Sequence, residues 1–214
     1  MKSRARNEGE KLERRQAILE AGLRLWNETS YGDFTMSAVA EKAGVVKGTL
    51  YLYFETKEQL FLALISDLLA GYFDEADARL EEGGRWSKSR VVQVLSDAFA
   101  GRDAFTRMLT VLGNICEHNV SYEQLVAFKR LTLERFTRTA SLLRKRLPFL
   151  RAGAALRLVM HLGALAAGLA HVSYPSPLLD KVLELPDLRV MRVDLQAEFA
   201  AAAAAIVAGM EKAR

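Results

Sequence analysis

The sequence predicts an all-α protein, in which a small N-terminal helix-turn-helix domain of three helices precedes a larger C-terminal helical bundle, with about nine helices in total. Apolar residues recur at helical spacing along most of the chain, and no β-rich segment interrupts them. The chain has 214 residues, half of them apolar. That length suits one small domain joined to one larger helical body.

Residues 35–53 predict the helix-turn-helix. The first of its helices has an apolar stripe at i, i+3, i+4 and i+7, formed by Met36, Val39, Ala40 and Ala43. Thr35 or Ser37 can cap its start, and Gly44 can take the left-handed conformation that the turn requires. On the second helix, Val45 and Leu50 are spaced to pack inward. The exposed side is then left to Lys47, Gly48, Thr49, Tyr51 and Tyr53.

That exposed side carries hydrogen-bond donors and no acidic residue. A helix whose N-terminus enters the major groove lets a few such side chains reach base edges, so double-stranded DNA is the leading partner. Lys47 suits guanine acceptors, and Thr49 can bond a base or touch a thymine methyl group. Gly48 lets the backbone come close to the groove. A plain helical hairpin with an exposed tyrosine face is the structural alternative.

The run from Thr35 to Leu60 resembles the DNA-binding domain of the TetR (tetracycline-repressor-like) family of bacterial regulators. The residues that carry the resemblance are Thr35-Met36, Val39-Ala40, Ala43-Gly44-Val45, Lys47-Gly48-Thr49-Leu50-Tyr51, Tyr53-Phe54, Lys57-Glu58 and Leu60. The family's first helix is matched upstream by Ala17-Ile18-Leu19-Glu20-Ala21, Leu25-Trp26 and Gly32. The resemblance is dense over residues 14–65. Beyond about residue 80 no motif matches, since sensor domains of this family diverge almost completely.

The resemblance implies two domains and a set of DNA contacts. Residues 1–57 would form the DNA-binding domain, including a basic N-terminal arm, and residues 58–214 the ligand-sensing and dimerisation domain. In the family, the positions of Lys47, Thr49 and Tyr51 face base edges or the nearby backbone. Phosphate-gripping positions are matched by Thr35, Tyr53 and Lys57.

Helical periodicity and breaking residues place the remaining helices. Thr56 can cap a long helix that Glu81-Glu82-Gly83-Gly84 ends, and Pro148 stops a later one. Three prolines rule out continuous helix between the last two helices. The helices are predicted over residues 57–80, 87–99, 103–116, 121–147, 152–172 and 193–212.

We expect a pocket in the larger domain that is apolar and adaptable with a few polar anchors, as ligand sites generally are. By resemblance it would sense a small, largely apolar effector. The candidate lining is Phe105, Met108, Leu112, Cys116, Phe128, Leu131, Phe136, Met160 and His161. Aromatic and methionine residues at helical spacing also form plain core, and that alternative stays open for each of them.

The last two predicted helices are the dimerisation candidates. Their small residues offer a smooth face that lets another helix approach closely, and the resemblance implies that two subunits pair these helices in a four-helix bundle. The candidate interface residues are Gly153, Ala164, Ala167, Gly168 and Ala204. Packing inside a single subunit is the alternative.

The charge, the cysteine content and the apolar stretches of the sequence indicate its partner and its cellular compartment. A pI near 9.2 and a formal charge of +4 support attraction to phosphate without proving it. The single cysteine, Cys116, leaves no disulfide framework and predicts a reducing cytoplasm. The most apolar stretch, residues 152–172, contains Arg157, His161 and His171, which favours a buried helix over a membrane span.

The sequence favours neither an enzyme nor a metal site. Cys116 and His118 are two apart and point to different sides of a helix, and His161 and His171 are ten apart, unlike a helical zinc pair. No catalytic residue, cofactor or metal is therefore predicted. We expect an effector-responsive transcriptional regulator, most often a repressor in this family, which binds a palindromic operator as a dimer. An architectural DNA-binding protein without an effector is the main alternative, and an all-α enzyme is a remote one.

Overall fold

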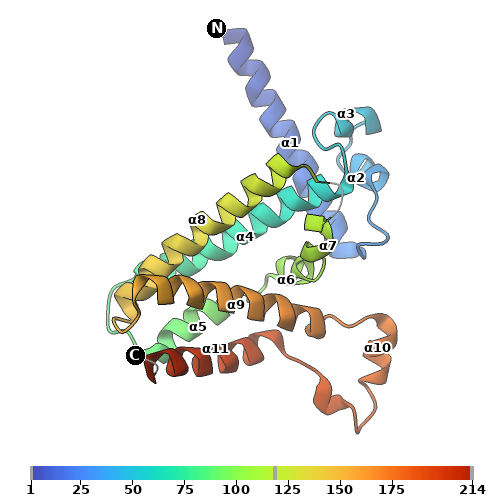
Figure 1. Ribbon diagram of the computed structural model, residues 1–214. Coiled ribbons are helices and arrows are strands. Elements are labelled where there is room, and N and C mark those ends of the chain that lie inside the picture. Colours follow the sequence, from blue (N-terminus) through green and yellow to red (C-terminus); the bar gives the residue numbers. More distant parts are fainter. Residues whose placement is uncertain (1, 118–119, 213–214) are drawn as a thin grey trace. The chain divides into compact units, whose positions relative to one another are not determined.

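The computed structural model describes residues 2–117 and 120–212 (Figure 1), with the side chains of residues 2–7, 114, 116 and 117 left out. No strand occurs in these ranges, which confirms the all-α prediction. The elements are α1 (Lys2–Glu28), α2 (Met36–Lys42), α3 (Lys47–Tyr51), α4 (Lys57–Glu81), α5 (Lys88–Asp97), α6 (Asp103–Leu109), α7 (Leu112–Glu117), α8 (Tyr122–Arg146), α9 (Ala152–Ser173), α10 (Pro177–Val182), the 3-10 helix η1 (Arg189–Met191) and α11 (Leu195–Lys212).

The chain forms two compact units. The first, here called the reader unit, comprises residues 1–67 and 111–128, and the second, the body unit, comprises residues 68–110 and 129–214. The long helices α4 and α8 each continue from one unit into the other. The sequence did not predict that α7 and the start of α8 would group with the N-terminal helices.

Phe61 of α4 is the centre of the reader unit's core. Its ring meets Trp26 of α1 edge-on at a centroid distance of 5.2 Å, and it lies 4.9 Å from Tyr31 and 4.6 Å from Phe34. Phe34 and Tyr31 stand in the connection between α1 and α2, so one buried ring fixes α1, this connection and α4 together. Aromatic contacts of this kind stabilise a core beyond the area that they bury.

Tyr72 of α4 has the corresponding place in the body unit. Its ring lies 4.6 Å from that of Phe99 and 5.6 Å from that of Phe105, and its hydroxyl donates a hydrogen bond of 3.0 Å to the main-chain oxygen of Leu95. Burial raises the pKa of the Tyr72 hydroxyl. Phe199 of α11 joins the cluster through Phe99, at 4.9 Å.

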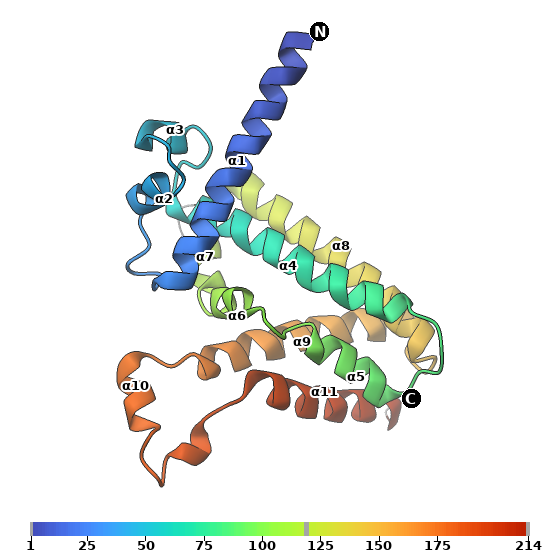
Figure 2. The ribbon, with the colours of Figure 1, turned by 180° about the vertical axis from the view of Figure 1, so that it is seen from behind.

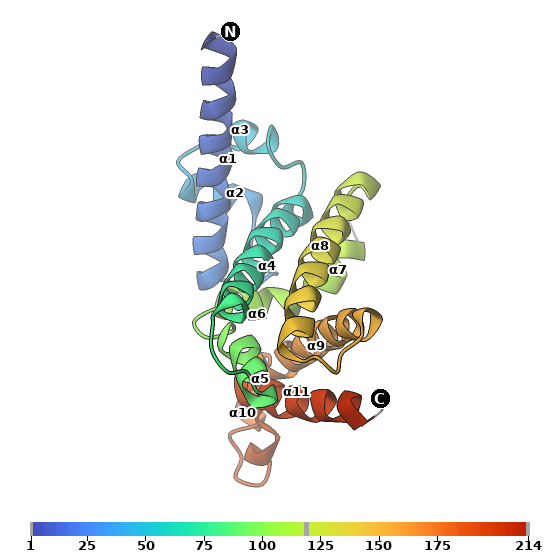
Figure 3. The same ribbon diagram turned by 90° about the vertical axis from the view of Figure 1, so that its left-hand side faces the viewer.

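Three helices of the body unit pack side by side: α11 lies against both α5 and α9 (Figure 2, Figure 3), and α6 also packs on α9. Between α9 and α11 the chain loops out through α10 and η1 (Figure 1). Pro177 begins α10, where its missing N–H is no loss. We predicted that residues 172–193 would not form a continuous helix. The segment contains the two short helices α10 and η1.

The single helix predicted over residues 103–116 is wrong. The structure has α6 and α7 there, with Thr110 at the end of α6. The Thr110 hydroxyl donates 2.7 Å to the main-chain oxygen of Arg107, and the Thr110 N–H donates 3.2 Å to the same oxygen. This tightened last turn ends the helix, an ending that the apolar periodicity did not reveal.

Helix α9 is long and apolar enough to cross a membrane by length and composition, although only 28% of its most apolar stretch is buried within the chain. The buried side consists of Ala155, Leu158, Val159, Leu162, Ala166 and Ala170. The sequence led us to expect a buried helix, and the single chain buries one face of it.

Candidate nucleic-acid interface and effector cavity

Helix α2 and the turn after it have the predicted geometry. Of the two predicted caps it is Thr35 that caps α2, because its Oγ1 accepts a hydrogen bond of 3.2 Å from the Ala38 N–H. Gly44 has φ +65°, in the left-handed region, so the prediction for the turn is confirmed. The Gly44 N–H donates to Glu41 O and the Val45 N–H to Ala40 O, both at 3.0 Å, which satisfies the carbonyls at the end of α2.

Helix α3 packs on α2 and is anchored by Leu50, whose side chain is 0% exposed. Val46 precedes the helix in an extended conformation, and its carbonyl accepts from the Thr49 N–H at 2.9 Å and from the Leu50 N–H at 3.3 Å. The opposite face is accessible. It consists of Val46, Lys47, Gly48, Tyr51 and Leu52, with Thr49 and Tyr53 partly buried.

The charge on this face is positive and concentrated near the start of α3. Lys47 Nζ lies 5.9 Å from the centroid of the Tyr51 ring, a cation–π arrangement that keeps the ammonium group beside the tyrosine. From Val45 to Phe54 the sequence has no acidic residue. The face therefore offers donors and a cation to a partner that is rich in acceptors and negative charge, which is the chemistry of a DNA groove.

Lys57 and Tyr31 form a link that the sequence did not predict. Lys57 Nζ donates a hydrogen bond of 2.8 Å to the main-chain oxygen of Tyr31 and lies 3.9 Å from the centroid of its ring. The Tyr31 hydroxyl donates to Glu58 Oε1 at 3.0 Å. Burial, followed by the bond to Glu58 and the charge of Glu58, raises the pKa of Tyr31 to about 12. An ammonium group has three donors, so Lys57 keeps capacity for a phosphate.

The candidate dimer residues lie on α9 and α11 of the body unit. Gly153, Ala164 and Gly168 on α9 are exposed, and Ala167 is half-buried. On α11, Ala204 is exposed together with Ala197, Ala201, Ala205 and Gly209. The single chain thus leaves these small residues accessible on two adjacent helices, here called the small-residue surface, with Arg157, Met160 and His161 also exposed on α9.

The candidate pocket residues are divided between the two units. Leu112, Cys116 and Phe128 belong to the reader unit, and the side chain of Cys116 lies outside the described residues. In the body unit, Phe105 and Met108 are buried, Leu131 and Phe136 are half-buried, and Met160 and His161 are exposed on α9. The ring of Phe136 lies tilted against that of Phe73 at a centroid distance of 5.5 Å, so Phe136 shares in the aromatic core of that unit.

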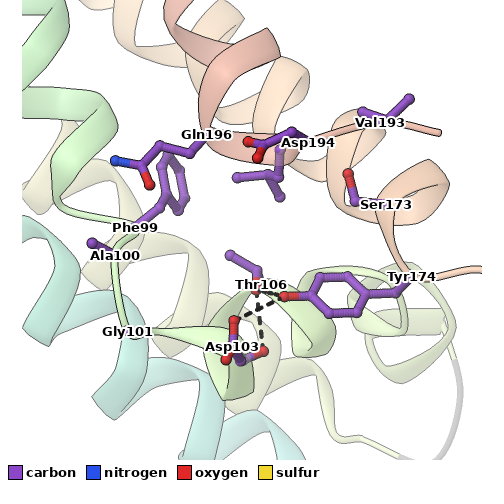
Figure 4. A pocket seen from close by; sticks show the side chains of 11 residues that line it. Phe99, Ala100, Gly101, Asp103, Thr106, Ser173, Tyr174, Val193, Asp194 and Gln196 are labelled. Atoms are coloured by element: carbon purple, nitrogen blue, oxygen red, sulfur yellow. Dashed lines mark hydrogen bonds between the residues drawn. The ribbon is translucent and has the colours of Figure 1, made fainter. Parts of the chain in front are cut away.

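A cavity of about 280 Å³ lies elsewhere in the body unit (Figure 4), at the N-termini of α6 and α11 and the C-terminus of α9. Its lining includes Phe99 and several polar groups that the sequence analysis did not single out. The Tyr174 hydroxyl is 2.7 Å from Thr106 Oγ1 and donates 3.3 Å to Asp103 Oδ1. The Ser173 hydroxyl oxygen is buried without a partner among the described residues. The lining is completed by Ala100, Gly101, Val193, Asp194, Leu195 and Gln196.

Comparison with protein families explains both units. Residues 18–64 match the model of the bacterial regulatory proteins of the tetR family, and residues 66–214 match that of the tetracyclin repressor-like C-terminal domain. The second match alone spans more than half of the chain. The protein belongs to the TetR family. Members bind DNA and typically act as dimers with small-molecule effectors, and this TetR-family protein is a DNA-binding transcriptional regulator.

Individual relatives match over part of the chain. The uncharacterized HTH-type transcriptional regulator YhgD of Bacillus subtilis (strain 168) is 37% identical over 70 residues, which are 33% of this chain and 37% of YhgD. The fatty acid metabolism regulator protein of the same strain is 28% identical over 83 residues, 39% of this chain and 42% of that protein. The matches thus span about two-fifths of these relatives.

Solved structures match over nearly the whole chain. A possible TetR family transcriptional regulator from Streptomyces coelicolor A3(2) superposes with a TM-score of 0.62 at 21% identity, covering 94% of this chain and 100% of that one. At this identity the likeness establishes the fold of the TetR-family chain and leaves its ligands open.

Among the side chains that the structure describes, which exclude that of Cys116, histidine and carboxylate groups do not gather into a metal site. His161 and His171 are both exposed on α9. His118, which the sequence analysis weighed with Cys116 as a catalytic or metal group, lies outside the described residues.

Proposed function

We propose that the protein is a repressor that binds a palindromic DNA operator as a homodimer and leaves it when a small, largely apolar effector binds. The accessible face of α3 carries this proposal. Lys47, Thr49 and Tyr51 would contact base edges or the nearby backbone from this face, while Thr35, Tyr53 and Lys57 would grip phosphates. Such phosphate contacts position a protein, and base contacts discriminate between sequences.

Homodimer formation is supported by the small-residue surface of α9 and α11. A surface of alanine and glycine lets the helices of a second copy approach closely, and each subunit would then present one α3 to one half-site. Half-sites one helical turn apart, about 34–36 Å, are the spacing that two such helices read. Effector binding would favour a dimer in which the two α3 helices no longer match this spacing.

Two places compete for the effector. The predicted lining, which includes Phe105, Leu131 and Phe136, suits an apolar molecule, and the cavity beside Tyr174 and Thr106 suits a smaller one with hydrogen-bonding groups. A relative that regulates fatty acid metabolism makes acyl amphiphiles a sensible first class of probe. A regulatory role without catalysis, in the cytoplasm and away from membranes, completes the proposal.

The experiment that tests the operator is selection of bound fragments from a randomised duplex library at near-physiological salt, followed by sequencing. Wild type should recover a two-fold symmetric motif, and Tyr51→Ala should lose it. Tyr122→Ala, which removes an exposed tyrosine of α8, is the matched control and should recover the same motif. Retention of DNA without any motif would mean that the protein grips DNA by charge alone.

The effector is tested by thermal stabilisation, because a ligand that binds the native state raises the unfolding temperature. Hydrophobic drugs, amphiphiles and acyl conjugates form the screen. Hits are repeated with Leu131→Gln and with Tyr174→Phe, which alter the predicted lining and the cavity respectively. If no compound stabilises the protein or weakens DNA binding, the architectural alternative without an effector gains support.

A further inference from the structure

We propose that Val46 contributes to operator specificity by packing against the C5-methyl group of a thymine in each half-site. This inference rests on the DNA binding proposed above and adds a base-reading residue to it. The observation behind it is an aliphatic side chain that stands open to solvent at the N-terminal end of the helix that reads DNA.

The aliphatic side chain of Val46 is left open to solvent in the folded chain. Its side chain is 74% exposed, whereas Leu50, one turn further along, is 0% exposed and fixes α3 to the core. Aliphatic side chains gain free energy when they leave water. Most of the apolar surface of Val46 is exposed in the free protein, so burying it against a partner would still contribute free energy to binding.

Val46 also stands at a position of the helix where valine is uncommon. It is the N-cap of α3, where serine, threonine, asparagine and aspartate are strongly preferred and valine is among the poorest residues. Three other helices have hydroxyl caps, since Thr35 on α2, Ser87 on α5 and Ser176 on α10 each accept a hydrogen bond from the helix, whereas α6 and α9 begin at arginines without such a bond. Valine at this cap forgoes that bond and keeps an apolar surface exposed.

The N-terminal residues of a recognition helix are the ones that reach base edges. In the major groove the thymine C5-methyl is the one apolar group among the features that the bases present, and aliphatic side chains recognise it by contact. Gly48 has no side chain to hold the backbone of α3 away from the groove. The space beside it is open, because a Cβ added there would meet nothing within 4 Å among the described residues. Lys47 and Thr49 supply donors on the same face, so Val46 complements them with apolar contact.

Leu52 provides an internal comparison. It is 83% exposed, but it stands at the C-terminal end of α3. That end lies away from the residues that enter the groove first. If exposure alone produced an apolar contribution to DNA binding, Leu52 and Val46 would behave alike. We infer that they differ, and that Val46 alone responds to the thymine methyl group.

The test removes the methyl group from the DNA and the side chain from the protein separately. In the operator obtained by selection, each thymine is replaced in turn by deoxyuridine, at the same place in both half-sites, and affinities are measured by titration. Wild type should weaken at one such thymine by roughly fourfold per half-site, the worth of one buried methyl group. Val46→Ala should bind the thymine and deoxyuridine operators equally, and Leu52→Ala should keep the wild-type difference.

Val46→Ser separates recognition from helix stability. Serine is a good N-cap, so the unfolding temperature should rise, while sensitivity to the thymine methyl group should be lost. A fall in the unfolding temperature with both Val46→Ser and Val46→Ala would show that packing within the protein holds Val46, and would overturn the inference.

The outcomes distinguish the inference from the function on which it rests. If wild type selects no motif, the proposed operator binding itself fails. If it selects a motif but no thymine-to-deoxyuridine change weakens binding, or if Val46→Ala keeps the wild-type sensitivity, operator binding stands and the role of Val46 is overturned.

Discussion

Lys57 Nζ donates a hydrogen bond of 2.8 Å to the main-chain oxygen of Tyr31, across 26 positions of the chain. The same ammonium group lies 3.9 Å from the Tyr31 ring centroid. Lys57 begins α4, and Tyr31 stands in the connection between α1 and α2. A residue predicted to grip phosphate is therefore also part of the internal structure of the reader unit, and its removal should have two separate effects.

Lys57→Ala should weaken binding to all DNA sequences alike and lower the salt slope of binding by about one unit, because one phosphate contact is lost. It should also lower the unfolding temperature, since the Tyr31 carbonyl loses its partner. Salt titrations on operator and random DNA measure the first effect. Lys88→Ala makes the same charge change in the body unit, where Lys88 pairs with Glu211, and should leave the salt slope unchanged.

Lys47→Ala should act differently, because Lys47 is exposed at the start of α3. We expect a loss of about 1–3 kcal/mol in discrimination at one operator position, with little change on random DNA. Competition binding against single-base variants of the selected operator measures this. Equal losses on operator and random DNA would mean that Lys47 grips phosphate instead.

The helix-turn-helix of the reader unit was predictable from the sequence, because the residues that determine its fold lie close together in the chain. The cap at Thr35, the turn at Gly44 and the inward anchor at Leu50 all depend on residues within a few positions of one another. Short-range spacing of this kind survives in a single sequence.

The link from Lys57 to Tyr31 and the cavity were not predictable in the same way. The cavity joins segments near residues 99–106, 173–174 and 193–196, which no helical periodicity relates. The division of residues 103–116 into α6 and α7 occurs at a tightened turn, where the side chain and the main chain of Thr110 both bond to Arg107 O. The candidate lining, spread over both units, stays a prediction for the ligand experiments.

Ala204→Glu should convert the proposed dimer into monomers in sedimentation experiments. Ala204 is exposed on α11 within the small-residue surface, and a carboxylate buried there without a partner would cost more than close helix packing contributes. Ala78→Glu makes the same change at an exposed position of α4 and should leave the proposed dimer intact. A dimer that survives Ala204→Glu and Ala167→Glu would place the interface elsewhere.

Thr139→Val should destabilise the body unit by about 1–3 kcal/mol at neutral pH. The Thr139 hydroxyl donates a hydrogen bond of 2.6 Å to Oδ1 of Asp77, which is buried on α4. Valine has nearly the same shape and no donor, so the buried carboxylate would lose this bond. Chemical denaturation measures the change, and Thr137→Val, at an exposed position of α8, is the control.

The Asp77 carboxyl group should make the free energy of unfolding of the body unit depend on pH. Burial raises its pKa above the ordinary 3.8, against the opposing effects of the Thr139 bond and the charge of Arg138, whose Nε lies 3.0 Å from Oδ2. Between 3.8 and the raised pKa, the unfolded chain has released a proton that the folded chain still holds. The contribution of this group to stability is therefore fully present below pH 3.8 and is lost as the pH rises through the folded-state pKa.

Asp77→Asn cannot ionise, so it should escape that loss. The free energy of unfolding of the variant, relative to wild type, should rise with increasing pH and level off above the folded-state pKa of Asp77. Denaturant titrations at a series of pH values measure this difference. Asp74→Asn, at an exposed carboxylate of the same helix, should not show the rise. If Asp77→Asn instead lost stability relative to wild type as the pH rose, the attraction of the exposed Arg138 would outweigh the burial of Asp77, and this ion pair would be a net source of stability.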